Sequence, residues 1–266
     1  MRKIKFYKYH GTGNDFIMID NRSQKVVFDS PEMIAALCHR RFGIGADGLI
    51  LLEESGSFDF KMKYYNSDGN EGSMCGNGGR CIVAFAHFLG VISGKTTFEA
   101  VDGLHEAELS GTEENIPVVS LKMNDVSEVI HENGASILNT GSPHYVIFCE
   151  DAESVEVVTE GKKIRYSPKY MTDGINVNFV SVKDDFFSIR TYERGVEDET
   201  FSCGTGTVAA ALALESQGKT NGKELVKFET KGGFLEVSFK KTGNLYSDIH
   251  LIGPAEQVYD GSFELQ

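Results

Sequence analysis

An internal repeat is the feature that most limits how this chain can fold. Two Cys-Gly-x-Gly motifs begin at Cys75 and Cys203, 128 positions apart in a chain of 266 residues. A common spacing across most of a chain indicates a duplicated half. We therefore expect two similar halves, residues 1–123 and 124–253, with the junction in the polar stretch 124–139. Five further landmark pairs share the spacing without gaps: Asn14 and Ser142, Gly48 and Asn176, Tyr64 and Tyr192, Glu71 and Glu199, and Gly90 and Gly218.

Each half is predicted to contain a strand, a polar loop and then a helix. Residues 58–65 alternate apolar and polar side chains, as in a half-buried strand, and residues 186–193 do so less regularly. Apolar residues at helical spacing follow over 80–89 and 208–217, and a glycine stands after each segment. Four alanines between positions 209 and 213 indicate that the second helix is central and buried.

The rest of the chain is mostly strand-like, which favours the α+β fold class. A further helix is predicted over 31–42, with Ser30 as its cap and Pro31 in its first position. We expect two pseudo-symmetric halves, each with many short strands wrapped around one central helix. The remaining candidate strands are 4–9, 16–20, 49–53, 96–100, 118–123, 145–149, 177–182, 225–229, 234–239 and 249–252.

Composition argues against several classes of protein. Lys and Arg number 26 against 39 Asp and Glu, a net charge of −13, so no nucleic-acid-binding surface is expected. No apolar run approaches the roughly 20 residues of a membrane-spanning helix, no signal peptide is visible, and no membrane partner is expected. Five cysteines, an odd number, favour free thiols in a reducing cytoplasm over a disulfide framework.

Two other patterns are better explained by structure than by ligand binding. Residues 43–48 match G-x-G-x-x-G, but a predicted helix precedes them and a strand follows, the reverse of a dinucleotide site. A glycine turn from helix to strand is the favoured interpretation. The cysteines lack the C-x-x-C spacing of a zinc site, so no metal is expected. Cys38, Cys81 and Cys149 are interpreted as core residues.

Cys75 and Cys203 differ from the other cysteines because each directly precedes a glycine-rich helix start. A thiol there faces unpaired backbone N–H groups and the positive end of the helix dipole, which make a thiolate accessible near neutral pH. Glycine lets a ligand approach the backbone closely, and a helix N-terminus is a natural carboxylate site.

Two such thiols at equivalent positions suggest racemisation or epimerisation of an amino acid. If both helix starts face one cleft, one thiolate removes the α-proton and the opposing thiol protonates the other face of the carbon. Backbone N–H groups would stabilise the charge that develops on the substrate carboxylate. The sequence shows no lysine signature for a pyridoxal cofactor, and no cofactor is expected.

Five motifs connect the chain to a known family. They are Gly-Thr-Gly-Asn-Asp-Phe at 11–16, Asn-Ser-Asp-Gly at 66–69, Met-Cys-Gly-Asn-Gly-Gly-Arg-Cys at 74–81, Tyr-Glu-Arg-Gly at 192–195 and Ser-Cys-Gly-Thr-Gly at 202–206. With these motifs the chain resembles diaminopimelate epimerase almost end to end. The resemblance implies a homodimeric, pyridoxal-independent enzyme that interconverts LL- and meso-diaminopimelate for lysine and peptidoglycan synthesis. It also implies that each half is a mostly antiparallel, β-barrel-like sheet around its helix, with residues 254–266 returning to the first half.

The resemblance also implies roles for individual residues. Cys75 and Cys203 would be the catalytic pair, and His144 and Glu193 would assist the two thiols. A guanidinium pairs with a carboxylate in a bidentate fork, which suits Arg194 to the distal carboxylate of the substrate. The substrate would be held by Asn14, Asn66, Gly76, Asn77, Asn176, Glu193, Arg194, Gly204 and Thr205.

The chain departs from the family pattern at two positions. Many relatives carry Asn where this chain has Ser142, and some carry Gln where it has Gly48. Because Ser142 is shorter and offers only a hydroxyl, we expect one contact to the distal end of the substrate to be lost or bridged by water.

Two alternative functions stay open at this point. A proline or hydroxyproline racemase-like enzyme uses the same two-thiol design, but it would carry His in place of Asn77. It would also carry Asp-Arg-Ser-Pro where this chain has Glu-Thr-Phe-Ser at 199–202. A non-enzymatic binding protein or redox switch would instead join Cys75 and Cys203 in a reversible disulfide.

Overall fold

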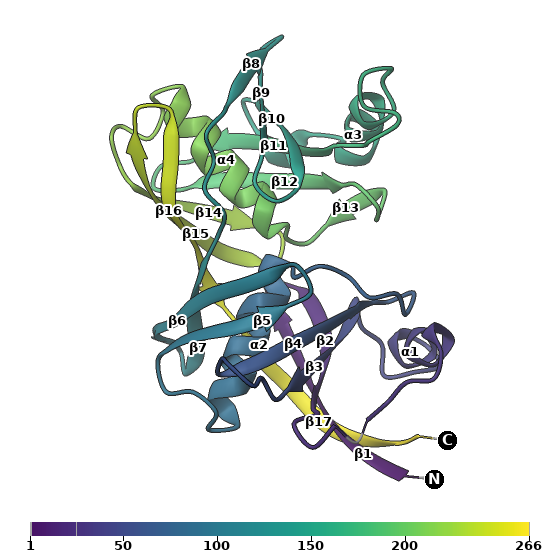
Figure 1. Cartoon of the computed structure of the whole chain (residues 1–266). Coiled ribbons are helices and arrows are strands. Elements are labelled where there is room, and N and C mark those ends of the chain that lie inside the picture. The colour runs from purple at the N-terminus through teal and green to yellow at the C-terminus, as the bar shows by residue number, and fades with distance from the viewer. Residues whose placement is uncertain (1, 25, 266) are drawn as a thin grey trace. The chain divides into compact units, whose positions relative to one another are not determined.

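The computed structural model describes residues 2–24 and 26–265. Met1, Lys25 and Gln266, which the expected halves include, lie outside the described residues. Strands and a few helices alternate along the chain, which confirms the α+β fold class (Figure 1). Within the described part of the chain, every helix is too short or too polar to cross a membrane.

The chain divides into two compact units. One unit runs up to Leu121 and includes the segment from Pro254 onward, and the other is Lys122–Gly253. The segment after Pro254 reaches the first unit as a strand, because β17 pairs antiparallel with β1 along almost its whole length (Figure 1). The first unit contains β1 (Arg2–Gly11), β2 (Asn14–Asp20), α1 (Pro31–Cys38), β3 (Gly48–Glu53), β4 (Phe60–Asn66), α2 (Gly76–Phe88), β5 (Lys95–Ala100), β6 (Gly103–Glu113), β7 (Ile116–Lys122) and β17 (Glu256–Leu265).

The second unit repeats the order of strand pairings found in the first. In the first unit β1–β2 is antiparallel, β2–β3 parallel, β3–β4 antiparallel, β4–β5 parallel, and β5–β6 and β6–β7 antiparallel. The same series runs through β9–β10, β10–β11, β11–β12, β12–β14, β14–β15 and β15–β16. Its elements are β8 (Ile130–Glu132), β9 (Ala135–Asn139), β10 (Pro143–Phe148), η1 (Ala152–Ser154), α3 (Val157–Arg165), β11 (Asn176–Val182), β12 (Phe187–Glu193), β13 (Asp198–Thr200), α4 (Gly204–Ser216), β14 (Leu225–Thr230), β15 (Gly233–Thr242) and β16 (Leu245–Pro254).

The register of the first parallel pair also repeats. Phe16 lies opposite Gly48 between β2 and β3, and His144 lies opposite Asn176 between β10 and β11. Each residue of the second pair is 128 positions after its counterpart. The spacing found in the sequence therefore corresponds to equivalent places in the two folds.

The helices α2 and α4 form the centres of the two cores. Residues 76–86 of α2 and 206–214 of α4 are all buried, which is typical of a helix enclosed on all sides. Strand β3 contacts α1 as well as α2. It is consequently buried on both faces, which explains its uninterrupted run of apolar residues.

The end of one helix differs from the prediction, and the starts of the two central helices agree with it. The helix predicted over 31–42 ends at Cys38, because His39 leaves helical geometry and its Nδ1 accepts hydrogen bonds from the next N–H groups. Ser30 is the N-cap of that helix, but its side chain makes no capping bond. The two central helices begin immediately after their cysteines, at Gly76 and Gly204, as the Cys-Gly-x-Gly motifs predicted.

Candidate active site

The first predicted cysteine caps helix α2. Cys75 is the N-cap residue, and its Sγ accepts a hydrogen bond from the backbone N of Gly78 at 3.2 Å. A Cβ atom on Gly78 would lie 3.2 Å from this sulfur and 3.2 Å from Cδ1 of Ile50. The glycine therefore lets the backbone N–H approach the sulfur, and the first turn of α2 presents further N–H groups without intrahelical acceptors.

A buried polar chain connects the start of α2 to strand β2. Nδ2 of Asn77 donates to Oδ1 of Asn14 at 3.2 Å, and Oδ1 of Asn77 accepts from Nη2 of Arg80 at 3.0 Å. Asn14 in turn donates to Oδ2 of Asp47 at 2.7 Å. Nη2 of Arg80 also donates to Oγ1 of Thr12 at 3.2 Å. These contacts bring two of the predicted substrate-binding residues, Asn14 and Asn77, together beside the cysteine.

Arg80 is a buried cation that sequence reasoning did not single out. Its side chain is fully buried, and among the described residues it has no carboxylate partner and its Nε has no hydrogen bond. Burial lowers the pKa of Arg80 to about 10, and negative charge on Cys81 or Cys75 would raise it. A thiolate at Cys75 and the Arg80 cation would therefore stabilise each other.

Asn66 and Gly48 lie opposite each other where β3 and β4 pair. Nδ2 of Asn66 lies against Gly72, where an added Cβ would be only 2.9 Å away. A Cβ on Gly48 would lie 2.5 Å from Cε2 of Tyr64 and 2.6 Å from the carbonyl oxygen of Tyr65. The Tyr64 ring thus occupies the space that a larger residue at position 48 would need.

The second predicted cysteine begins helix α4. Cys203 is the N-cap residue and is buried, and its Sγ lies 3.5 Å from Oγ1 of Thr205. The carbonyl oxygen of Cys203 accepts from Oγ1 of Thr207 at 2.9 Å. Oγ1 of Thr140 donates to the carbonyl oxygen of Thr205 at 2.9 Å and ties the first turn to the end of β9.

His144 is completely buried beneath this helix start. Its Nε2 lies 2.9 Å from Oγ1 of Thr205, and its Nδ1 lies 3.1 Å from Nδ2 of Asn178. Burial, and secondarily the positive charge of Arg194, lower the pKa of His144 to about 3. The imidazole is therefore neutral at physiological pH, and Thr205 contacts both it and Cys203.

A third group of predicted residues gathers around Ser142. Nδ2 of Asn176 donates to Oγ of Ser142 at 2.8 Å, and Oδ1 of Asn176 accepts from the backbone N of Arg194 at 2.8 Å. Nη2 of Arg194 lies 3.5 Å from the same Ser142 hydroxyl. Ser142 thus orients Asn176 and the Arg194 guanidinium. Glu193 is the last residue of β12, and its Oε2 accepts from Oγ1 of Thr200 at 2.8 Å.

The predicted residues are divided between the two units. Asn14, Asn66, Cys75, Gly76 and Asn77 belong to the first unit, and the others belong to the second. Sequence reasoning missed Arg80, which contacts Asn77 and Thr12, and Asn178, which contacts His144. The available signals were a charge inside the apolar face of the predicted 80–89 helix and an Asn inside an apolar strand.

The other cysteines and the glycine-rich segment 43–48 lie outside the candidate site. Cys38 and Cys81 are buried core residues, and none of the five cysteines, all of which are described, forms a disulfide. Residues 43–48 connect α1 to β3, so the glycine-rich segment is a helix-to-strand turn. In the described part of the chain, no three His, Cys, Asp or Glu side chains are grouped as metal ligands would be.

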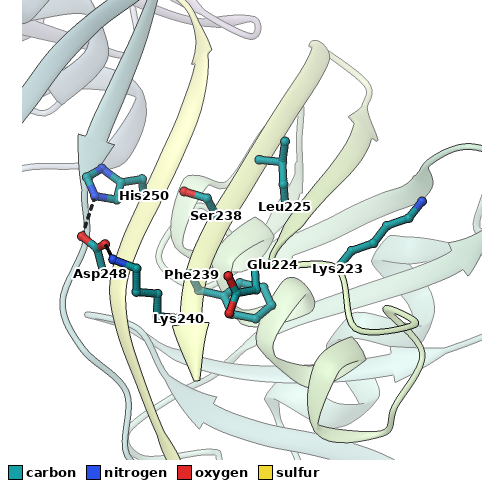
Figure 2. Close-up of a pocket in the computed structure, with 8 residues that line it drawn as sticks. All are labelled: Lys223, Glu224, Leu225, Ser238, Phe239, Lys240, Asp248 and His250. Carbon is teal, nitrogen blue, oxygen red and sulfur yellow. Dashed lines mark hydrogen bonds and ion pairs between the residues drawn. The ribbon is translucent and has the colours of Figure 1, made fainter. Parts of the chain in front are cut away.

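A separate hollow of about 750 Å³ lies on the second unit (Figure 2). Oδ2 of Asp248 accepts a hydrogen bond there from Nζ of Lys240 at 2.7 Å, and Oδ1 of Asp248 lies 3.1 Å from Nε2 of His250. The hollow contains none of the predicted site residues. Its lining consists of Lys223, Glu224, Leu225, Ser238, Phe239, Lys240, Asp248 and His250.

Comparison with known proteins connects the whole chain to one family. The model of the diaminopimelate epimerase family matches residues 6–129 and 136–258. A diaminopimelate epimerase from Flavobacterium psychrophilum is 55% identical over 259 residues, which cover 97% of this chain and 99% of that protein. A diaminopimelate epimerase from Chlorobaculum tepidum is 46% identical over 261 residues, which cover 96% of this chain and 99% of that protein.

Solved structures with low sequence identity share the fold. A Bacillus anthracis phenazine biosynthesis protein of the PhzF family has a TM-score of 0.79 at 13% identity, over the full length of both chains. A hydroxyproline epimerase from Agrobacterium vitis has a TM-score of 0.71 at 14% identity, covering 99% of this chain and 93% of that one. At these identities the likeness concerns architecture alone.

Proposed function

The chain belongs to the diaminopimelate epimerase family, and we propose that it interconverts LL- and meso-diaminopimelate with a cysteine thiolate and a cysteine thiol, without a pyridoxal cofactor. The observation that carries this proposal is the equivalent placement of Cys75 and Cys203, each the N-cap of a buried, glycine-rich central helix. The reaction serves the synthesis of lysine and of peptidoglycan precursors.

The chemistry follows from two sulfur atoms on opposite sides of one α-carbon. One thiolate removes the α-proton, and the opposite thiol donates its proton to the other face, so the configuration inverts and the thiolate changes place. The carbanion that forms between these steps spreads its charge onto the α-carboxylate. N–H groups at the helix starts, including those of Gly76 and Gly204, are suited to stabilise that carboxylate because they carry the positive end of each helix dipole.

Cys75 is the better candidate for the resting thiolate. Its sulfur already accepts the Gly78 N–H at 3.2 Å, and the buried Arg80 supplies a positive charge with no carboxylate to compensate it in the described structure. His144, whose ring contacts Thr205 beside Cys203, is neutral and so brings no fixed charge. A thiolate at Cys75 and a thiol at Cys203 is therefore the favoured starting state.

The remaining polar residues suit a substrate with two amino-acid ends. Asn14, Asn77 and Asn66 offer amide donors and acceptors in the first unit. Arg194, held by Asn176 and Ser142, suits the distal carboxylate, and Glu193 suits an ammonium group. Ser142 contacts both Asn176 and the Arg194 guanidinium and so orients these two neighbours.

Assembly and location complete the proposal. We propose that residues 1–123 with 254–266, and 124–253, are the two duplicated halves, and that two copies of the chain form a homodimer. Five cysteines without a disulfide in the described residues support a reducing compartment, the cytoplasm. The family supports a small-molecule substrate, and the net charge of −13 argues against nucleic acid as a partner.

Isotope incorporation tests this function directly. Reduced enzyme is incubated with LL-diaminopimelate in heavy water, and the meso product is examined by mass spectrometry and NMR. We expect one deuterium, at the inverted α-carbon, because the delivered proton comes from a thiol that exchanges with solvent. Proline and 4-hydroxyproline serve as control substrates and should keep their configuration. Meso product without solvent deuterium, or inversion of the control substrates alone, would contradict the proposal.

A further inference from the structure

Asn178 occupies a position where the orientation of its amide can be assigned. It lies in β11 and is completely buried. Its Nδ2 lies 3.1 Å from Nδ1 of His144 and 3.4 Å from the carbonyl oxygen of Tyr145, and its Oδ1 lies 3.0 Å from Oγ1 of Thr191. A carbonyl oxygen can only accept hydrogen bonds, so the NH₂ end of the amide faces Tyr145 and the oxygen faces Thr191.

This orientation decides where His144 carries its hydrogen. The second hydrogen of the Asn178 amide points to Nδ1 of His144, so Nδ1 is an acceptor. A neutral imidazole has one donor and one acceptor nitrogen, and its hydrogen therefore lies on Nε2. Nε2 then donates to Oγ1 of Thr205, which is 2.9 Å away.

Thr205 lies between His144 and Cys203, and its hydroxyl can accept a hydrogen bond from one and donate to the other. Because its Oγ1 already accepts from His144, its own hydrogen needs an acceptor, and Sγ of Cys203 lies 3.5 Å away. We propose that Asn178 is a positioning residue that fixes the His144 tautomer and thereby makes the Thr205 hydroxyl a hydrogen-bond donor to Cys203. The chain of donors stabilises the Cys203 thiolate whenever it forms, and His144 acts in it as a neutral donor.

The first half of the repeat lacks this chain of donors. At the equivalent positions, 128 residues earlier, Phe16 replaces His144, Ile50 replaces Asn178 and Asn77 replaces Thr205. Cys75 instead accepts the Gly78 N–H and lies near the Arg80 cation. The two halves therefore stabilise their sulfur atoms differently, one with a fixed charge and the other with oriented neutral dipoles.

Gly206 is the residue of the second cysteine motif that makes room for this arrangement. A Cβ atom on Gly206 would lie 2.4 Å from Oδ1 of Asn178. Any other residue there would displace the amide from His144. At the equivalent place in the first half, Gly78 faces the apolar Ile50 side chain at 3.2 Å.

The test replaces Asn178 by its closest isostere with the opposite hydrogen-bonding character. Asn178→Asp presents an acceptor to Nδ1 of His144, so the neutral ring should carry its hydrogen on Nδ1, and Nε2 should no longer donate to Thr205. The readouts are the ¹⁵N chemical shifts of His144 and the pH midpoint of Cys203 alkylation, followed by peptide mass spectrometry in a Cys75→Ala background. The wild-type side chain should show the Nε2–H tautomer, and the variant should lose it. The midpoint should rise by about one pH unit.

Two substitutions at Thr205 test the hydrogen bond from its hydroxyl to Cys203 without the charge that Asn178→Asp adds. Thr205→Val should raise the Cys203 midpoint similarly, whereas Thr205→Ser should leave it near the wild-type value. If Asn178→Asp does not fold, this pair and the wild-type tautomer decide the question. An Nδ1–H tautomer in the wild type, or equal midpoints for the Val and Ser variants, would overturn the proposal. The inference rests on the proposed function only in treating Cys203 as an acid–base group. Its readouts need no substrate, so its failure is distinguishable from that of the isotope experiment.

Discussion

A buried neutral histidine makes stability depend on pH at the scale of a single residue. Burial and the charge of Arg194 lower the pKa of His144 to about 3, whereas a histidine in an unfolded chain titrates near 6.5. Between these values the unfolded chain binds a proton that the folded chain does not. The free energy of unfolding therefore falls as the pH drops from about 6.5 toward 3.

Replacing His144 by Gln should reduce this pH dependence. His144→Gln removes the titrating ring and keeps an amide that can donate to Thr205. Urea unfolding at pH 7 and pH 4.5 measures the effect, and the wild type should lose roughly 3 kcal/mol more than the variant over that interval. Equal losses in the two proteins would assign the pH dependence to other groups, such as the ion-paired Asp15.

The sequence identified the candidate catalytic cysteines, but it did not identify the side chains that contact the residues around them. Cys75 and Cys203 could be singled out because cysteine before a glycine-rich helix start is an unusual local pattern. Arg80 and Asn178 could not be assigned roles, because their partners come from distant strands. Thr12 lies 68 positions from Arg80, and His144 lies 34 positions from Asn178.

At the scale of elements, strand β17 stabilises the first unit through its half-buried face. Phe263 is half-buried against the core cluster that contains Ile4 and Phe6, and its ring centroid lies 6.4 Å from that of Phe6. Phe263→Ala should lower the free energy of unfolding by about 2 kcal/mol, because the truncated side chain leaves this packing incomplete. The neighbouring exposed residue provides the control, since Glu264→Ala should change stability by less than about 0.5 kcal/mol. Similar effects of both substitutions on denaturant unfolding would contradict this role.

Element positions were predictable where local pattern and tertiary packing agree. Strands with clear apolar alternation, such as β4, and strands with long apolar runs, such as β3, were found within two residues of their bounds. The start of α2 was predicted from the Cys-Gly-x-Gly motif and not from apolar periodicity, because the glycines of 76–79 are poor helix formers that burial holds in a helix. Strand β6 and helix α3 were missed because most of their residues are exposed and carry little apolar periodicity.

At the scale of the whole molecule, the mechanism requires both reactive sulfur atoms to reach one α-carbon. Thiols that meet in this way should oxidise readily to a disulfide. Mild oxidation should therefore inactivate the enzyme, and a dithiol reductant should restore its activity. Peptide mass spectrometry should find Cys75 joined to Cys203 in the inactive form. Full activity in protein completely crosslinked between these residues would contradict the mechanism.

The two-half architecture was predictable because duplication leaves a constant spacing between equivalent residues in the sequence. One spacing of 128 residues relates the cysteine motifs and also the register of β2–β3 to that of β10–β11. The differences between the halves were not predictable from the repeat. Phe16 and Ile50 in one half replace His144 and Asn178 in the other, and only the folded structure shows that His144 contacts both Asn178 and Thr205.

Variants that lack one cysteine test whether Cys75 and Cys203 both act on one stereocentre. Epimerisation of LL-diaminopimelate is measured for Cys75→Ala, Cys203→Ala and the control Cys149→Ala, whose half-buried thiol lies outside both helix starts. We expect Cys75→Ala and Cys203→Ala each to lose about a thousandfold or more in turnover, and Cys149→Ala to keep wild-type turnover. Turnover within about twofold of the wild type in either Cys75→Ala or Cys203→Ala would contradict this expectation, since loss of an essential acid or base costs far more than that.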